Sequence, residues 1–401
     1  MTSRRTDAPP QGDGLAPRII YSAAAMIALL PFSTDVFLTV LVDVGHDLHV
    51  DVAGAQRTML AFTLGFAIAH LFVGTAADRF GRRPTALAAI AVFIASSVLA
   101  AVSPDITVLT LARFIQGLAA AAGPIVARTL VRDTIAPERA GEALSHIGAL
   151  YGLAPLIAPM IGVAGAQLAG WRGAPAFLAI YATILFAGLV RFLPETQAPS
   201  SGRGPNVSLF ATLSKLVRNR AFLVGALAFA SAYGGLFSWL TTSAFLLIGK
   251  LGMARFEASL IYTLGSGGFL LGGVLSMKLA QRLIPRIVLR IGAAGMLLGC
   301  LGPIVAYSAG ATQWWIYLIA ILPFYVAWGL VQPAATAIAM RPFPDIAGQA
   351  SAWLGMSQQI GGIVFAFIAA SLGGGPVTLA IMLVCAALFT VSVFLPPQTR
   401  T

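Results

Sequence analysis

Two charged residues, Asp35 and Arg113, lie inside long apolar stretches of this chain. A charge at the centre of a bilayer costs about 2.5–3.5 kcal/mol, so each side chain must face a cavity or a partner. A low dielectric disfavours a charged carboxylate, which would let Asp35 take up and release a proton near neutral pH. Because arginine keeps its proton, any proton switching falls to Asp35. Gln116 shares the helix face of Arg113.

The two charges are expected at one depth in the bilayer. A helix rises 1.5 Å per residue, which puts Asp35 roughly 10 Å and Arg113 roughly 12 Å below the outer ends of their spans. The sequence therefore predicts an ion pair whose contact changes when Asp35 gains or loses a proton. A fixed structural ion pair, or a carboxylate that only holds packing through Ser33 or Thr34, is the alternative.

A second polar feature is the segment from Gly74 to Arg83, GTAADRFGRR, which separates two apolar runs. Glycines let the backbone turn sharply and let helices approach closely, and arginines hold such an edge in the cytoplasm. We predict a tight loop between two spans at the water-facing edge of a membrane. Its candidate residues for a conformational role are Gly74, Asp78, Arg79, Gly81, Arg82 and Arg83.

A weaker copy of this segment runs from Gly273 to Arg282, after the eighth apolar run. Two basic positions are kept as Lys278 and Arg282, whereas the acid and second glycine are replaced by Met277 and Ala280. This pattern is typical of a decayed duplication, and transporter folds are built from such repeats.

An apolar run rich in glycine and proline extends from 148 to 162. Prolines are tolerated in membrane helices as kinks, and small residues allow close packing against a neighbouring helix. We predict a purposeful bend formed by Gly148, Gly152, Pro155, Pro159 and Gly162. The alternative is that glycine and proline are simply common in such helices.

Aromatic and amide side chains in other spans could line a central cavity and stack on a lipophilic substrate. The same side chains could instead face lipid or pack between helices. Two aromatic groups stand out, one at 233–239 and one at 324–328 with Phe324 and Tyr325. The predicted lining is Asp35, Arg113, Gln116, Tyr151, Tyr233, Phe237, Trp239, Trp328 and Gln358.

The composition identifies the solvent as a bilayer. The chain is 58% hydrophobic and 10% charged, with a mean hydropathy of +0.88, whereas soluble proteins carry about 25% charged residues. The net charge of +11 does not indicate nucleic-acid binding, because the basic residues lie between apolar runs and form no basic face. Cys300 and Cys385 lie in apolar runs and are interpreted as core residues, not as a disulfide or metal pair.

A helix needs about 20 apolar residues to cross the hydrocarbon. This predicts an all-α membrane protein with twelve spans, near 19–42, 54–77, 84–102, 105–127, 140–167, 173–193, 221–248, 257–281, 285–308, 313–340, 346–371 and 375–396. Residues 1–18 are predicted to be a disordered cytoplasmic N-terminus. A linker at 197–220 divides the spans into six-helix bundles at 19–196 and 221–401.

The distribution of basic residues sets the orientation. With both termini inside, most arginines and lysines fall at the cytoplasmic ends of the spans. The other side keeps only Arg57, Arg172, Lys250 and Arg255. We therefore expect a multi-pass protein of a bacterial inner membrane with both termini in the cytoplasm.

These motifs resemble the major facilitator superfamily and, within it, the Bcr/CflA drug:proton antiporters. Residues 74–83 are similar to the family's loop motif G-x-x-x-D-R-x-G-R-R, and residues 113–117 resemble its R-x-x-Q-G motif, linked to proton transfer. Ser33-Thr34-Asp35 is similar to an S-T-D motif whose acid is tied to coupling. The run 154–162 looks like the antiporter motif, and 193–196 is L-P-E-T as in the group. The proline usual after the first acid is missing from 37–40, and Ala154 and His70 replace the usual Gly and Gln.

The resemblance implies two pseudo-symmetric six-helix bundles around a midplane cavity. It implies proton-coupled efflux of small lipophilic or amphipathic compounds, antibiotics among them, by alternating access. It also implies that Asp78 helps to lock the outward state, by pairing with Arg128 or Arg132 or by facing the N-terminus of span eleven near Asp345. A metabolite transporter for a nucleoside, sugar or amino acid, or a membrane sensor without transport, remains an alternative.

The sequence contains no P-loop for ATP, no nucleophile–base arrangement and no metal-ligand spacing. We therefore expect no enzymatic activity and no cofactor or metal, with the proton gradient as the energy source. The expected partners are a small-molecule substrate, protons and the lipid bilayer. Neither nucleic acid nor a partner subunit is expected, so the protein is predicted to be a monomer.

Overall fold

The computed structural model describes residues 15–70, 72–135, 137–196, 209–343, 346–373 and 375–394. The described residues form helices and connecting turns, and no strand occurs among them. The predicted disordered N-terminus lies mostly outside these ranges, as does the first half of the predicted linker, residues 197–208.

The first half of the chain begins with the helix that carries Asp35. Its elements are α1 Leu15–Pro31, the π-helix η1 Phe32–Val36, α2 Leu41–Asp47, α3 Val52–Ala69, α4 Val73–Phe80, α5 Arg82–Ala101, α6 Ile106–Ala120, α7 Ala122–Thr134, α8 Pro137–Ala169, the 3₁₀ turn η2 Gly170–Arg172 and α9 Gly173–Phe192. We call α1 to α9 the N half.

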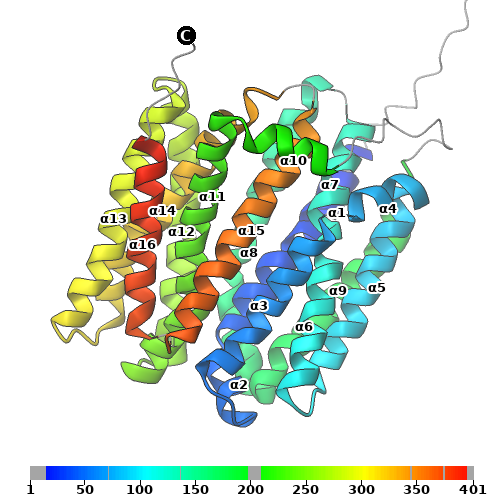
Figure 1. Cartoon of the computed structure of the whole chain (residues 1–401). Helices are drawn as coiled ribbons and strands as arrows, with labels where there is room; N and C mark the ends of the chain where they lie inside the picture. Colours follow the sequence, from blue (N-terminus) through cyan, green and yellow to red (C-terminus); the bar gives the residue numbers. More distant parts are fainter. Residues whose placement is uncertain are drawn as a thin grey trace, which may run out of the picture.

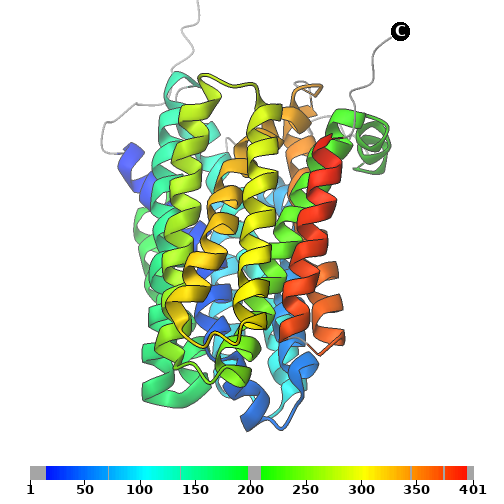
Figure 2. The same ribbon diagram turned by 90° about the vertical axis from the view of Figure 1, so that its left-hand side faces the viewer.

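The second half repeats the plan of long antiparallel helices. Its elements are α10 Leu209–Val217, α11 Arg220–Ala244, the π-helix η3 Phe245–Lys250, α12 Arg255–Ala280, α13 Pro285–Ser308, α14 Trp314–Met340, α15 Ala347–Ser371 and α16 Pro376–Phe394. We call α11 to α16 the C half. The two halves lie side by side in Figure 1, and Figure 2 shows the C half from its outer face.

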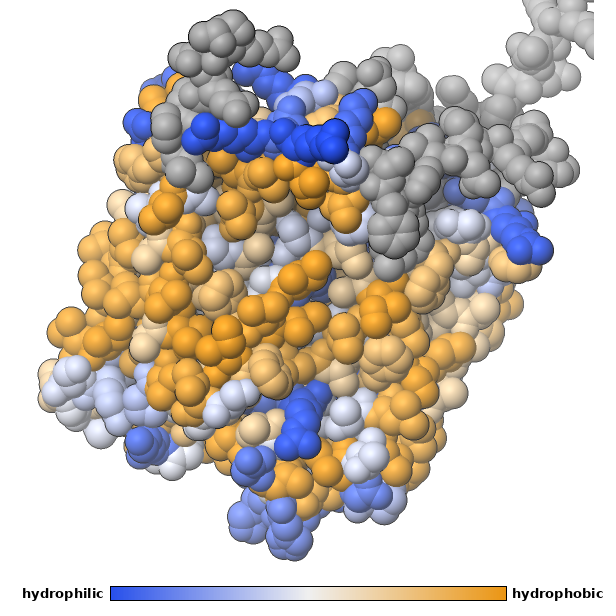
Figure 3. Space-filling view, in the orientation of Figure 1, coloured by the Kyte–Doolittle hydropathy of each residue, from blue (hydrophilic) through white to orange (hydrophobic). Residues whose placement is uncertain are grey.

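Eleven helical segments of the described chain are long and apolar enough to cross a membrane. One of them, His146–Phe192, has 47 residues and contains most of α8 and all of α9. At 1.5 Å per residue it is roughly 70 Å long, more than twice the hydrocarbon thickness. Counted as two crossings, it would give the expected twelve. Figure 3 shows the apolar belt between more polar ends.

The two ends of the bundle differ in what they carry. One end, at the top of Figure 1, carries α4, α10 and the last turn of α16, and we call it the linker end. The opposite end carries α2, and we call it the α2 end. The segment 74–83 lies at the linker end.

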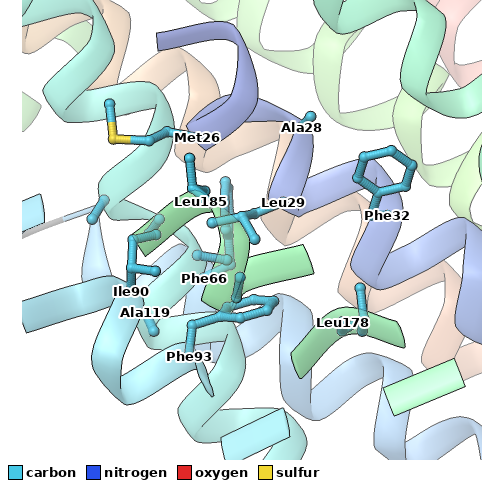
Figure 4. Close-up of a cluster of buried hydrophobic side chains, with 14 of the residues drawn as sticks. Met26, Ala28, Leu29, Phe32, Phe66, Ile90, Phe93, Ala119, Leu178 and Leu185 are labelled. Carbon is cyan, nitrogen blue, oxygen red and sulfur yellow. The ribbon is translucent and has the colours of Figure 1, made fainter. Parts of the chain in front are cut away.

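Each half has its own apolar core. One cluster of buried side chains runs from Ile19 to Leu193, and part of it is shown in Figure 4. A second runs from Leu216 to Val393 and takes in only Leu38 from the N half. This division agrees with two bundles, although the exact boundaries stay predictions.

Corresponding helix pairs in the two halves are held together by glycines. A Cβ on Gly117 of α6 would lie 1.9 Å from the Phe62 carbonyl oxygen of α3, so any larger residue would push the helices apart. In the C half, a Cβ on Gly272 of α12 would lie 2.0 Å from the Val326 carbonyl oxygen of α14. Small residues permit such close backbone approach in membranes, and their recurrence supports an internal repeat.

The prediction of a tight loop over residues 74–83 is wrong in its extent. Most of that segment is helical, as α4 and the first turn of α5. The chain turns only at Gly81, where φ is +100° and a side chain would be strained.

Candidate functional site

Asp35 lies in a widened helical turn that follows α1, near the end of the first span. The five residues of η1 form a π-helix, and all of them are buried. Such single wide turns occur often at functional sites. Asp35 is 9% exposed, and its Oδ1 accepts a hydrogen bond from the Thr34 hydroxyl at 2.9 Å. The turn therefore holds one carboxyl group with a single described hydrogen-bond donor inside the bundle.

Arg113 is fully buried on α6 and faces the same turn. One guanidinium nitrogen donates to the Ser33 carbonyl at 2.8 Å, and another donates to Oε1 of Gln116. The guanidinium also lies 4.5 Å from the ring centroids of both Phe37 and Phe62. These cation–π contacts are strongest where water is excluded, so the cation is held by rings and neutral oxygens.

Gln116 extends this network toward α5. Its Nε2 donates to the Ser97 hydroxyl at 2.6 Å, and that hydroxyl donates to the Phe93 carbonyl at 2.7 Å. The amide orientation is thereby fixed, with its oxygen toward Arg113. Sequence reasoning identified Gln116 but not Ser97, which sits in a run of ordinary apolar and small residues.

The expected direct ion pair between Asp35 and Arg113 is absent. No carboxylate lies within salt-bridge distance of Arg113 in the described ranges. The two residues do belong to adjoining structure, because Arg113 binds the carbonyl of Ser33, two positions before Asp35. Depth alone does not fix the direction in which a side chain points, and the described hydrogen bond of the Asp35 carboxyl group is with Thr34.

Asp35 instead lies within electrostatic reach of three tyrosine hydroxyl groups. Tyr151 comes from α8, Tyr233 from α11 and Tyr325 from α14. Two of these were predicted to line a cavity with Asp35, and the structure brings them to it. Tyr325 was noticed only as one of several aromatics. We call Asp35 and these tyrosines the Asp35 cluster.

The other predicted aromatics take different positions around this cluster. Phe237 stacks on Tyr233 with centroids 5.5 Å apart, and Trp328 lies 5.7 Å from Tyr233. Trp239 is fully buried beside Tyr325. Gln358 on α15 is half-buried, one turn before a glycine whose Cβ would meet the Tyr233 ring. The aromatics are thus mainly packed between helices.

The predicted bend helix is α8, which contains both prolines without a break. Gly162 lies close to η1, because a Cβ there would be 2.4 Å from the Val36 carbonyl oxygen. Gly152 faces the C half, where its Cβ would be 2.4 Å from Leu270. Gly148 has open space around it, so the prediction of close packing is wrong at that position. The glycines at 152 and 162 let α8 touch both the carboxylate turn and the opposite half.

At the linker end, Arg82 is the centre of an ionic network. It pairs with Asp78 at 2.5 Å and with Asp133 of α7 at 3.1 Å. Arg132, one of the partners expected for Asp78, also pairs with Asp133 at 3.3 Å. The other expected partner, Arg128, donates to a backbone carbonyl of its own helix. Asp345 lies outside the described residues.

Glu195, the acidic residue that follows the last helix of the N half, has a structural role. Its carboxylate accepts the backbone N–H groups of Arg82 and Arg83 at 3.0 and 3.2 Å. Those are free N–H groups at the start of α5, where a negative charge is favoured. The side chain of Arg83 donates to the Val190 carbonyl at 2.7 Å. Glu195 therefore ties the turn at Gly81 to the end of α9.

At the α2 end, polar contacts join the two halves. Arg255 of α12 pairs with Asp43 of α2 at 2.5 Å. Gln56 of α3 donates to the Thr241 carbonyl of α11 at 3.0 Å. Sequence reasoning missed all four residues, since each looks like an ordinary polar residue near a span end. The halves are therefore in contact at this end.

Cys300 and Cys385 are both buried and free, in line with their interpretation as core residues. Among the residues that the structure describes, no group of three or more His, Cys, Asp or Glu side chains could hold a metal ion.

Comparisons with known proteins place this geometry in a family. The family model described as Major Facilitator Superfamily matches residues 23–366. Multidrug resistance protein D of Escherichia coli K12 is 27% identical over 379 residues, which is 94% of each chain. The bicyclomycin resistance protein homolog of Haemophilus influenzae is 26% identical, over 88% of this chain and 89% of that one.

A solved structure of a D-xylose-proton symporter superimposes with a TM-score of 0.75 at 17% identity, covering 95% of this chain and 97% of the other. At that identity the likeness concerns the fold alone. The family model matches most of the chain, and the structure has two helical halves and the superfamily's loop motif. This chain is therefore a multi-pass membrane protein of the major facilitator superfamily.

Proposed function

We propose that this protein exports small lipophilic or amphipathic compounds, antibiotics among them, from the bacterial cytoplasm in exchange for protons. The names of its relatives, a multidrug resistance protein and a bicyclomycin resistance protein homolog, support this class of substrate. The apolar and aromatic surroundings of Tyr233 are suited to such compounds better than to sugars, which need many hydrogen-bonding groups.

The observation that carries the proposal is the position of Asp35. It is a carboxyl group 9% exposed in a wide turn, within electrostatic reach of tyrosines from both halves. Ionisable groups inside a membrane mark proton relays and substrate pathways. In this scheme the carboxylate takes up one proton from the outside, which releases the substrate, and gives it up to the cytoplasm before the next substrate binds.

Arg113 acts in this scheme as a positioning residue. By holding the Ser33 carbonyl it supports the η1 turn that carries Asp35. A lysine cannot reproduce this role, because its single ammonium lacks the planar fork that reaches several acceptors at once. Arg113→Lys should therefore impair coupling nearly as much as removal of the charge.

The proton gradient is sufficient for export. One proton moving down 100 mV yields about 2.3 kcal/mol, and one pH unit adds about 1.4 kcal/mol. Together, roughly 3.7 kcal/mol sustains a concentration ratio of several hundred for one proton per neutral substrate. No nucleotide or other cofactor is required in this proposal.

The linker end is assigned to the cytoplasm because arginines gather there. With this orientation, contacts such as Asp43–Arg255 hold the outer side closed. Opening of the α2 end with closure of the linker end would complete alternating access within a monomer.

The test uses the full-length protein in vesicles with an imposed pH gradient and an internal pH dye. We expect a lipophilic antibiotic to evoke proton movement with the wild type and none with Asp35→Asn. Asp105→Asn is the matched control, since Asp105 caps α6 at the membrane edge and asparagine caps equally well. Thermal unfolding checks that each variant folds.

Substrate-evoked proton flux that persists in Asp35→Asn would refute the assignment of the coupling residue. A wild type that binds the antibiotic but moves no proton would indicate a sensor. Flux evoked by a sugar, nucleoside or amino acid but by no lipophilic compound would indicate a metabolite transporter.

A further inference from the structure

A groove on the membrane face of the N half lies between α1, α8 and α9. Its cavity volume is about 230 Å³. On α1 it is lined by Tyr21, Ala25, Ala28 and Phe32, at alternating spacings of three and four residues that place them on one face of the helix. Figure 4 shows Phe32 on the side of α1 away from the core residue Phe93.

The groove opens sideways toward the bilayer. Tyr21 is 64% exposed, and the α8 residues Leu153 and Ile157 are 51% and 50% exposed. Tyr181 of α9 closes the floor, where its hydroxyl donates to the Ala25 carbonyl at 2.8 Å and its ring packs on Phe32. With the Tyr181 hydroxyl satisfied on the floor, the groove presents a mainly apolar surface to whatever enters it, and the Tyr21 side chain stands exposed at its linker end.

The linker end of the groove carries two arginines. Arg18 is one turn before Tyr21 on the same face of α1, and its guanidinium lies 5.9 Å from the ring centroid of Phe192 on α9. Arg191 lies 5.5 Å from the same ring. Neither has a carboxylate within salt-bridge distance in the described part of the chain. Two like charges beside one ring favour an anion between them.

The dimensions favour a slender occupant. Sites for drug-sized molecules have volumes of about 300–1,000 Å³, above the 230 Å³ of this groove. From Tyr21 to Phe32 the groove follows α1 for roughly 16 Å at 1.5 Å per residue. An acyl chain is long, narrow and apolar, and it would lie along this path with its headgroup at the level of the arginines.

We propose that this groove is a binding site for an anionic phospholipid, with one acyl chain between α1, α8 and α9 and the phosphate between Arg18 and Arg191. Basic residues between spans at the cytoplasmic side are suited to anionic headgroups. All three helices belong to the N half, so rocking of the halves leaves the groove intact. The bound lipid supports α1 directly behind Phe32, the first residue of the turn that holds Asp35.

The experiment measures lipid retention by native mass spectrometry of the full-length protein released from nanodiscs of mixed phosphatidylglycerol and phosphatidylcholine. We expect one tightly retained phosphatidylglycerol. Each arginine should contribute about fivefold in affinity, from about 1 kcal/mol per basic residue, so Arg18→Gln with Arg191→Gln should weaken retention about 30-fold. Both side chains are exposed, so this double variant is expected to fold.

The matched control is Arg290→Gln. Arg290 lies 4.9 Å from the ring centroid of Phe394 at the linker end of the C half, the same type of contact without the groove, and retention should not change. Ala25→Phe, which fills the groove, should lose the lipid while both arginines remain.

Equal retention of phosphatidylcholine, or equal loss from Arg290→Gln, would overturn the assignment of the arginines. Full retention by a folded Ala25→Phe would overturn the groove. Displacement of the lipid by the cation tetraphenylphosphonium at equal concentration would show that the groove takes lipophilic cations and not a lipid. None of these outcomes depends on proton-coupled transport.

Discussion

The ion pair between Asp43 and Arg255 gives a sharp test of how the α2 end is closed. It joins α2 to α12, with the carboxylate side chain 21% and the guanidinium side chain 43% exposed. The second carboxylate oxygen of Asp43 is buried without a hydrogen-bond partner in the described chain. Burial raises the pKa of Asp43 above its ordinary value, and Arg255 lowers it only in part. The nearby His46 also lowers this pKa, and Asp47 raises it.

This balance makes the two partners unequal. Arg255→Gln leaves a half-buried carboxylate without its cation, and the end should open. A pair this exposed contributes at most about 1 kcal/mol, which corresponds to roughly a fivefold shift toward the open state. Asp43→Asn removes the charge that burial disfavours, so it should leave the equilibrium nearly unchanged. The double variant should resemble Asp43→Asn, because no unpaired charge remains.

The dependence on pH has a definite sign. When the α2 end is closed, the pKa of Asp43 is higher than the pKa that the same carboxyl group has when the end is open and the group is exposed. The closed form therefore binds the proton more tightly than the open form. The contribution of Asp43 to closure is complete below its ordinary pKa and is lost as the pH rises through the raised pKa. In Arg255→Gln the open fraction should therefore be largest at neutral to alkaline pH and shrink as the pH falls.

The assay is a distance measurement by electron paramagnetic resonance. Spin labels at Arg57 of α3 and Lys250 of η3 report the separation of the halves, since both positions are exposed and the native cysteines are buried. The reasoning is refuted if Asp43→Asn opens the end as much as Arg255→Gln does. It is also refuted if acid increases the opening caused by Arg255→Gln.

Two further substitutions test the helix packing of the N half and the contacts of one acidic residue at its α2 end. Gly117→Ala should lower the unfolding temperature strongly in detergent, because its Cβ would lie 1.9 Å from a backbone oxygen of α3 and overpacking costs about 1–3 kcal/mol or more. Gly148→Ala is the control and should leave the unfolding temperature unchanged, because its Cβ would have no atom within 4 Å. Asp47→Asn should lower the unfolding temperature at neutral pH, with the difference from wild type vanishing in acid. Hydrogen bonds from Trp171 and Arg172 lower the pKa of Asp47, so its contribution is present above the ordinary pKa and lost as the pH falls through the lowered one; an acid-independent difference would contradict this.

Much of the fold could be predicted because a bilayer imposes strong constraints on a sequence. Apolar runs of about 20 residues must be helices that satisfy their own backbone hydrogen bonds. Side-chain direction is a finer property. Neither the π-turn at η1 nor the choice of Arg113 for the Ser33 carbonyl and Gln116 leaves a trace in hydropathy, so the ion pair with Asp35 was predicted and does not form. Tyr151 and Tyr233 could be selected because aromatic residues in spans are few enough to consider singly.

Contacts between distant segments were the part that sequence reasoning could not supply. Asp43 and Arg255 are separated by 212 positions, and nothing local distinguishes either from other charges near span ends. Glu195 was noticed only through a family motif, yet it caps α5 by a simple electrostatic mechanism. Such pairings depend on how the helices are arranged around each other, which no single span encodes.

We propose a route by which rocking of the two halves drives proton exchange at the Asp35 cluster. This route does not require any contact between Asp35 and Arg113 to break. Arg113 and Asp35 both belong to the N half, so a rigid rotation of the halves would leave their mutual geometry unchanged. Tyr233 and Tyr325 belong to the C half and must move relative to Asp35 when the halves rock. The solvation of the carboxylate therefore changes with conformation because part of its surroundings departs, while Arg113 keeps the turn in place. An ion pair within one half would be insensitive to that motion, so in the proposed scheme the carboxylate senses the conformation through its surroundings in the other half.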